Sequence, residues 1–538
     1  MMKKQLPLVF GVLVLLLVSC EDFTISPVYG GPGGGRENGR FYAQNMSNDN
    51  YYTLYADKLY SEANDPSTKC VVWAEKNCGI SSADAKKIAD EYNDKIYPKM
   101  MAAFGEVKSF NDALTGKTKV ASDTMEFADY YGDGDGKLCI LLLKIKDDYK
   151  QGVNNSFVAG YFTPYNYLQY TRGDTSSYYT NECDMIYLDV KVNKPGAADG
   201  LKKMGGTLAH EMQHLMNFIT SLDRRLEGNS LEQMDLWIDE GLSSAAEYVY
   251  SGEINKDRVD WFNEDPTGRI AQGNNFYVWD NYPIGSDGYP PVLDDYATVS
   301  LFFQWLRLQA GGDLDIYKDI IQSSDYDFNA VLDAAKLHIS NYNYAHAVTG
   351  GWRYLLRNWM AANYRNASTG PYGYEGAIKD INTTFYYSSS GGTYDFQFFP
   401  GEGIYSKSPS MPSPQEKIKF AGIPSSDSSA SSAPNDENLI GAEVMLSYNI
   451  DTELDNVSLS VAQIPLMPKS SIDISLQALP YNGTATSSRN AASPQSSPLS
   501  GPYAISAADM LRLNGQKKGV PAFSFYGMQK GKGIMFHE

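Results

Sequence analysis

The stretch 207–220, TLAHEMQHLMNFIT, constrains the fold of this chain more than any other part of the sequence. Its large apolar residues recur every three or four positions, which is the spacing that buries one face of a helix against a core. These residues are Leu208, Met212, Leu215 and Ile219. The sequence therefore predicts a helix that is anchored along one face and leaves its other face to polar residues.

The polar residues of this helix form a His-Glu-x-x-His motif. His210 and His214 lie four residues apart, so their imidazoles project from one side of a helix, one turn apart, as two ligands of one metal ion must. The chain has only 5 histidines in 538 residues, which makes a chance match unexpected. The motif predicts a zinc site, with Glu211 placed to act as general base and then general acid on a water molecule beside the metal.

A catalytic zinc ion takes three protein ligands and keeps a fourth position for water, so a second element must supply the third ligand. A helix is predicted from a capping box at Ser230 to about residue 250, and it carries two candidate carboxylates, Asp239 and Glu240. We favour Glu240, because its face also carries Ser244 and Glu247, which are expected to orient the histidines. The alternative is that both carboxylates are solvated surface charges.

The reaction expected at such a site also needs a donor to the oxyanion that develops on the substrate carbonyl. Tyr296 is one candidate, and His338 and His346 are less favoured. No spacing argument selects among the three.

Asp133 and Asp135 alternate with glycines in the segment 129–136, DYYGDGDG. Carboxylates in such a segment can wrap Ca²⁺, but the segment lacks the distal glutamate of a complete EF-hand loop. Asp-Gly pairs are strong turn signals. We therefore favour a plain turn and keep a calcium site as the alternative.

The first twenty residues have the pattern of an export signal. Lys3 and Lys4 precede an apolar run, 8–18, that is too short to span a bilayer and ends in Leu-Val-Ser-Cys at Cys20. This ending resembles the lipobox of bacterial lipoproteins, in which the signal is cut before the cysteine and the cysteine is acylated. We expect a signal peptide at 1–19, lipid attachment to the membrane at Cys20, and a location on the extracytoplasmic side of the bacterial cell envelope, in the outer membrane or on the surface. The alternative is an ordinary secretory signal.

The charge of the chain excludes one class of partner. Its formal net charge is −19 and its pI is about 4.8, so the clustered lysines and arginines that bind phosphate backbones are scarce, and no nucleic-acid partner is expected. The 40 tyrosines favour a strand-rich exported protein over aromatic ligand platforms. Four cysteines besides Cys20 leave three disulfide pairings open.

The sequence suggests four regions after the signal peptide. Residues 20–40 contain GGPGGGR and are expected to form a flexible tether; 41–370 alternate strand and helix patterns and form the predicted metal-binding domain; 371–432 are expected to be irregular or linker; 433–538 are expected to form a small β domain. In the second region we expect a helix over 81–104 that Pro98 kinks or ends.

The motif helix, together with WIDEGLSSAAEY at 237–248, resembles the hyicolysin family of zinc metallopeptidases within the glutamate-zincins. GDGDGKLCILLLKI, AGYF at 159–162 and NECDMIYLDV are similar to the strands that precede the motif in that family, so the resemblance covers about 41–364. It implies an α+β zincin-type catalytic domain, with a mixed sheet whose edge strand binds substrate above an active-site helix pair. It also implies zinc held by His210, His214 and Glu240, Glu211 as the catalytic acid/base, and a protein or peptide substrate cut as by an endopeptidase.

One position departs from that group. Ser244 stands where many glutamate-zincins carry an aspartate that supports a ligand histidine, which puts its expected role in question. The competing hypothesis is a non-catalytic surface binding or adhesion lipoprotein on a protease-like fold. An exopeptidase ranks lower, because no motif for holding a substrate terminus is visible.

Overall fold

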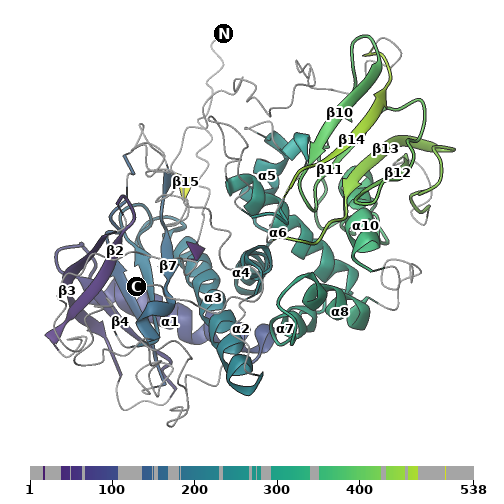
Figure 1. Ribbon diagram of the computed structural model, residues 1–538. Coiled ribbons are helices and arrows are strands. Elements are labelled where there is room, and N and C mark those ends of the chain that lie inside the picture. Colours follow the sequence, from purple (N-terminus) through teal and green to yellow (C-terminus); the bar gives the residue numbers. More distant parts are fainter. Residues whose placement is uncertain are drawn as a thin grey trace, which may run out of the picture. The chain divides into compact units, whose positions relative to one another are not determined.

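The computed structural model describes residues 16–17, 38–469 with gaps, and 503–504 (Figure 1). The gaps are 49, 63–66, 107–135, 148, 151–155, 168–180, 182, 229–233, 266–269, 274–275, 280–291, 340–350, 384, 426–431 and 455–457. Several expectations lie outside the described residues: Cys20, the tether to residue 37, the calcium segment, the cap at Ser230, and His346. No helix within the described part is both long and apolar enough to cross a bilayer.

The chain divides into two compact units. The first comprises 1–234, 242–253 and 499–538, and the second comprises 235–241 and 254–498. Helix α4 (Leu236–Ser251) therefore begins among the residues of the second unit and ends among those of the first.

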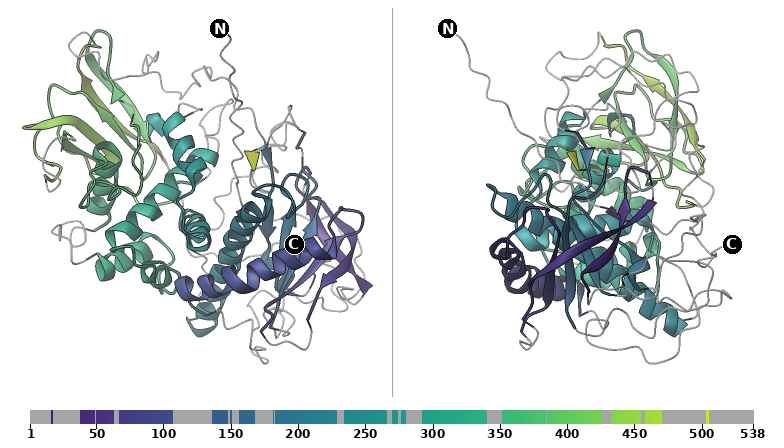
Figure 2. Two further views of the ribbon diagram at one scale, coloured as in Figure 1. Left: turned by 180° about the vertical axis from the view of Figure 1, so that it is seen from behind. Right: turned by 90° about the vertical axis from the view of Figure 1, so that its left-hand side faces the viewer.

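A seven-stranded mixed sheet forms the first unit, in the order β1-β7-β8-β5-β4-β3-β2 (Figures 1 and 2). Strands β4, β5 and β8 are parallel, whereas β7 runs antiparallel to β8 and β3 runs antiparallel to both β4 and β2. On its outer side β7 pairs with the two-residue β1. The bounds are β1 Leu16–Leu17, β2 Arg40–Asn45, β3 Asn50–Tyr60, β4 Cys70–Glu75, β5 Leu138–Leu143, β7 Gly160–Phe162 and β8 Met185–Asp189. A separate short pair joins β6 (Ser156–Phe157) to β15 (Tyr503–Ala504).

The central strands are apolar because both faces of the sheet are covered. All six residues of β5, LCILLL, are buried, as expected for a parallel strand packed on both sides. Helices α1 (Ser82–Glu91) and α3 (Gly200–Gly228) pack on one face. The other face carries a core that includes Phe41, Trp73, Leu141, Tyr161 and Tyr187.

The predicted helix over 81–104 forms with a change of pitch in its middle. Ser81 caps α1 through a capping box with Asp84. A π-helical turn (Tyr92–Ile96) then leads into α2 (Tyr97–Phe104), in which Pro98 is an N-terminal residue. Proline lacks the N–H that an α-helical ladder needs, and the wider turn before Pro98 absorbs this defect, so the helix continues.

A buried charge network joins the ends of β5 and β8. Asp189 accepts hydrogen bonds from the backbone N–H groups of Ile145, Lys191 and Val192. Asp147 accepts from Val158 N, and its carboxylate is paired with Lys191. Burial raises the pKa of Asp189 to about 7, against the lowering effect of Lys191.

Helices and aromatic side chains build the first part of the second unit. Trp237, near the start of α4, packs against Phe276, Tyr277 and Trp352. Tyrosine and tryptophan in this unit therefore contribute to its core. The helices are α5 Lys256–Glu264, α6 Val292–Gln309, α7 Asp315–Ile321, α8 Phe328–His338 and α10 Trp352–Arg365, with a 3₁₀ turn at Ile270–Gln272.

The remainder of the second unit is built from strands. A four-stranded sheet has the order β12-β13-β11-β9, and β10 pairs with β14. Their bounds are β9 Phe385–Tyr386, β10 Gly392–Phe398, β11 Gly403–Ser406, β12 Ile418–Pro424, β13 Ala442–Asn449 and β14 Ser460–Leu466. Strands β9 to β12 lie within 371–432, so the expectation of an irregular region there is wrong. Glycines and prolines break the alternation in this segment, and the strands are recognised by their pairing: β11 and β12 with β13, β9 with β11, and β10 with β14. The α+β fold class, with a mixed N-terminal sheet and small C-terminal sheets, is confirmed.

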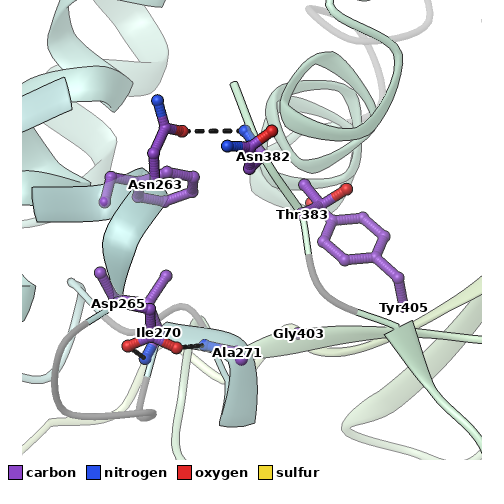
Figure 3. A pocket seen from close by; sticks show the side chains of 9 residues that line it. Asn263, Asp265, Ile270, Ala271, Asn382, Thr383, Gly403 and Tyr405 are labelled. Atoms are coloured by element: carbon purple, nitrogen blue, oxygen red, sulfur yellow. Dashed lines mark hydrogen bonds between the residues drawn. The ribbon is translucent and has the colours of Figure 1, made fainter. Parts of the chain in front are cut away.

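Side-chain hydrogen bonds fasten the strand part of this unit to its helices. Around a small pocket shown in Figure 3, Asn263 at the end of α5 donates to Asp380 O and accepts from Asn382 N. On α10, Arg353 and Arg357 both donate to the Asp436 carboxylate. The strands are therefore integrated with the helices and do not form a detached module.

All four cysteines of the described chain are buried free thiols. Cys139 and Cys183 belong to the same core on the sheet. Burial raises the pKa of the Cys70 thiol to about 12, which disfavours the reactive thiolate. None of the three possible pairings is formed.

Candidate metal centre

Helices α3 and α4 pack antiparallel, and the contacts follow one register. A Cβ on Gly205 of α3 would lie 2.4 Å from the hydroxyl of Tyr250, so only glycine lets the end of α4 approach this closely. Tyr250 is held in place by a 2.8 Å hydrogen bond to Glu91. Because the two helices are antiparallel, residues further along α3, from His210 to His214, lie opposite residues nearer the N-terminus of α4. This register brings Glu240 to the region of the two histidines.

His210 is oriented by a carboxylate on α4. Its Nδ1 lies 3.1 Å from Oε1 of Glu247, and both side chains are buried. A carboxylate at Nδ1 keeps the proton on that nitrogen, which makes Nε2 the ligand atom and raises its basicity.

His214 is oriented by a hydroxyl group. Ser243 Oγ lies 2.9 Å from Nδ1 of His214, and it also donates a hydrogen bond to Oε1 of Gln213. Because the serine proton goes to Gln213, the serine oxygen is left to accept from Nδ1–H of His214. The arrangement selects the same tautomer for His214 as Glu247 does for His210.

The expectation that Ser244 orients a histidine is wrong, and the role belongs to Ser243. At about 100° per residue, Ser243 and Glu247 lie about 60° and 20° to one side of Glu240, whereas Ser244 lies about 40° to the other side. Ser244 is buried, and its Oγ has no hydrogen-bond partner among the described residues. The face directed at α3 is thus the 240, 243 and 247 face.

Three buried side chains converge between the two helices. His210, His214 and Glu240 each offer one ligand atom, and these atoms lie within 4.8 Å of one another. Two imidazoles and one carboxylate form the donor set of a catalytic zinc ion with an open position. A buried carboxylate is stable when it is paired or bound to a metal, so a divalent cation suits this point.

The structure also places the other residues considered from the sequence. Glu211 is fully buried on α3, next to His210, and Asp239 is buried but is not a member of the converging group. Tyr296 is buried on α6 between the Arg258 guanidinium, 4.7 Å from its ring, and Trp279. His338 hydrogen-bonds to Asp319 at 2.6 Å, which joins α8 to α7. The role of Tyr296 as an oxyanion donor therefore stays a prediction.

The sequence did not reveal the roles of Ser243, Gln213 and Gly205. Periodicity gave the correct helix but not the direction of its neighbour, and without this direction Ser243 and Ser244 are equivalent. Gln213 and Gly205 carried no signal of their own, since a polar residue and a glycine on a helix are common in other contexts.

Comparison with known proteins agrees with this geometry. The chain is 28% identical over 308 residues to the neutral metalloprotease ShpI of Staphylococcus hyicus. The match covers 57% of this chain and 59% of that protein, so the chain spans less than two thirds of its relative. No protein family model matches the chain. The chain is thus a homologue of a metalloprotease and carries a buried His-His-Glu group suited to a catalytic zinc ion.

Proposed function

We propose that this protein is a zinc endopeptidase that hydrolyses peptide bonds of extracytoplasmic proteins while held to the bacterial cell envelope by a lipid on Cys20. The observation that carries the catalytic part is the convergence of His210, His214 and Glu240, with Glu211 next to the first histidine. The similarity to a neutral metalloprotease supports the choice of a peptide substrate.

Different residues of the chain have different roles in the proposed hydrolysis. Glu211 takes a proton from the attacking water and passes it to the leaving nitrogen, as base first and acid second. Glu247 and Ser243 hold the two imidazoles with Nε2 directed at the metal. When bound, zinc supplies Lewis acidity that polarises the carbonyl group and lowers the pKa of a water molecule to about 7.

Strand β7 supplies a place for an extended substrate. It lies against α3 and between β8 and β1, and because β1 falls within the predicted signal peptide, removal of that peptide would leave the outer edge of β7 free to pair with a peptide backbone. Pairing through the backbone tolerates many side chains, which fits cleavage within varied proteins.

Cleavage of a blocked peptide library by the purified protein tests the proposal. The wild-type protein is expected to cut peptides that are blocked at both termini, which separates an endopeptidase from an exopeptidase. Glu211→Gln is expected to keep its zinc and lose about 10²- to 10⁴-fold in kcat. Undiminished cleavage by Glu211→Gln, or no cleavage by a zinc-loaded wild type, would contradict the catalytic proposal, and the latter result would favour a binding or adhesion lipoprotein.

Lipid attachment is tested separately. Metabolic labelling with a palmitate analogue is expected to label the wild-type protein and leave Cys20→Ser unlabelled and released from the membrane fraction. Equal membrane association of the two proteins would refute the anchor and leave the catalytic proposal standing.

A further inference from the structure

Gly241 of α4 lies in unusually close contact with Phe303 of α6. A Cβ built on Gly241 would lie 2.2 Å from Cε2, 2.4 Å from Cδ2 and 2.7 Å from Cζ of the Phe303 ring. Carbon atoms in ordinary contact are about 3.5–4.0 Å apart. One added methyl group would therefore require the helix and the ring to separate by roughly 1 Å or more.

The Phe303 ring has little freedom to give way. Phe303 and Tyr317 are both fully buried, and their rings stack with centroids 6.3 Å apart. The Tyr317 hydroxyl donates a 3.0 Å hydrogen bond to the backbone carbonyl of Phe303, which fixes the main chain. The Trp237 ring meets Phe303 at 6.2 Å and 63°. Because the interior is close-packed around this ring, the displacement caused by a larger residue falls on α4.

Such a displacement would affect the position of Glu240 most directly. It precedes Gly241 on the same helix and is fully buried within the His-His-Glu group. Zinc–carboxylate bonds are about 2.0–2.2 Å long, with a tolerance of about 0.2 Å. A shift of α4 by roughly 1 Å is several times larger than this tolerance.

Helix propensity alone predicts the opposite effect. Glycine inside a helix is unfavourable relative to alanine, so Gly241→Ala would stabilise α4 if nothing touched it. A loss of stability in Gly241→Ala therefore indicates a contact that positions the helix, whereas a gain indicates a glycine without such a role.

We propose that Gly241 is a positioning residue, and that its contact with Phe303 sets the place at which α4 presents Glu240 to the metal. The inference rests on the proposed zinc site and adds the determinant of its geometry. It predicts that the two residues are energetically coupled, since a smaller side chain at 303 makes room for a larger one at 241.

Four variants of the full chain test the inference: Gly241→Ala, Phe303→Leu, the double variant, and Gly196→Ala. The last is the matched control, because a Cβ on Gly196 would meet nothing closer than 3.8 Å. Zinc affinity is measured by competition with a chelator, and kcat and KM are measured on a protein substrate. Thermal unfolding of the zinc-free proteins reports stability separately.

Gly241→Ala is expected to lose 10- to 100-fold in zinc affinity, with a fall in kcat larger than any change in KM. The zinc affinity of the double variant is expected to lie within about threefold of that of Phe303→Leu. The zinc affinity of Gly196→Ala is expected to match that of the wild type. If Gly241→Ala does not fold, the double variant decides: recovery of folding and zinc binding supports the inference, and failure overturns it. Wild-type affinity in Gly241→Ala overturns it too, whereas a wild-type protein that binds no zinc refutes the proposed function itself.

Discussion

Removing the Ser243 hydroxyl is the sharpest test of how the histidines are held. Ser243→Ala deletes the partner of His214 Nδ1, at 2.9 Å, and of Gln213 Oε1. Both groups are buried, since Gln213 is fully buried and His214 nearly so. Leaving buried polar groups unsatisfied costs about 1–3 kcal/mol each.

Part of this cost is expected to appear as lost zinc affinity. The ring of His214 becomes able to rotate and to exchange tautomers, and loss of such an outer contact typically weakens metal binding about 10- to 100-fold. That loss corresponds to about 1.4–2.8 kcal/mol. The assay is competition for zinc between the protein and a chelating indicator at constant pH, with kcat measured at saturating zinc.

Ser244→Ala is the matched control for this experiment. Ser244 is the adjacent serine on the same helix and is also buried, but its Oγ has no hydrogen-bond partner in the described part of the chain. The control is expected to bind zinc as the wild type does. Equal affinities in Ser243→Ala and Ser244→Ala would show that the hydroxyl does not position His214 and would refute the reasoning.

Three further predictions follow from the described contacts. Glu247→Gln keeps an acceptor at His210 Nδ1 but removes the charge, so it is expected to weaken zinc binding about tenfold. Glu247→Ala is expected to weaken zinc binding more. Chelator competition measures the two zinc affinities, and a weaker affinity in Glu247→Gln than in Glu247→Ala would contradict the prediction. Burial raises the pKa of Asp189 to about 7, so the folded state keeps a proton that the unfolded state releases above about pH 4. The stability contributed by Asp189 therefore falls as the pH rises from about 4 to 7. The free energy of unfolding in urea should depend less on pH for Asp189→Asn than for wild type, and identical pH slopes would disprove the assignment. Since the described cysteines are buried free thiols, a reducing agent should leave Tm unchanged and thiol reagents should react only on unfolding; a drop in Tm on reduction would reveal a disulfide.

The sequence predicted those features that one helix or one strand determines by itself. The periodicity of the motif helix gave α3, and its four apolar residues are all buried. The helix predicted over 81–104 begins where α1 begins, because the capping box that starts it is local chemistry.

Features that depend on how two elements pack against each other could not be predicted from the sequence. Ser243 and Ser244 differ only in which side of α4 they occupy, and α3 decides which side matters. Strands β9 to β12 pair with partners distant in the chain or across loops, so local patterns within 371–432 did not reveal them. Gly205 and Gly241 are explained only by the aromatic rings that lie against them.

The zinc content of the wild-type protein and of Glu240→Ala, compared after dialysis against a weak chelator, tests the central claim most directly. If α3 and α4 together hold one ion, the wild type retains one zinc per chain and Glu240→Ala, with both histidines intact, retains far less. A wild-type protein without zinc, or a Glu240→Ala variant that holds zinc as tightly as the wild type, would contradict the claim that these three side chains form one metal site.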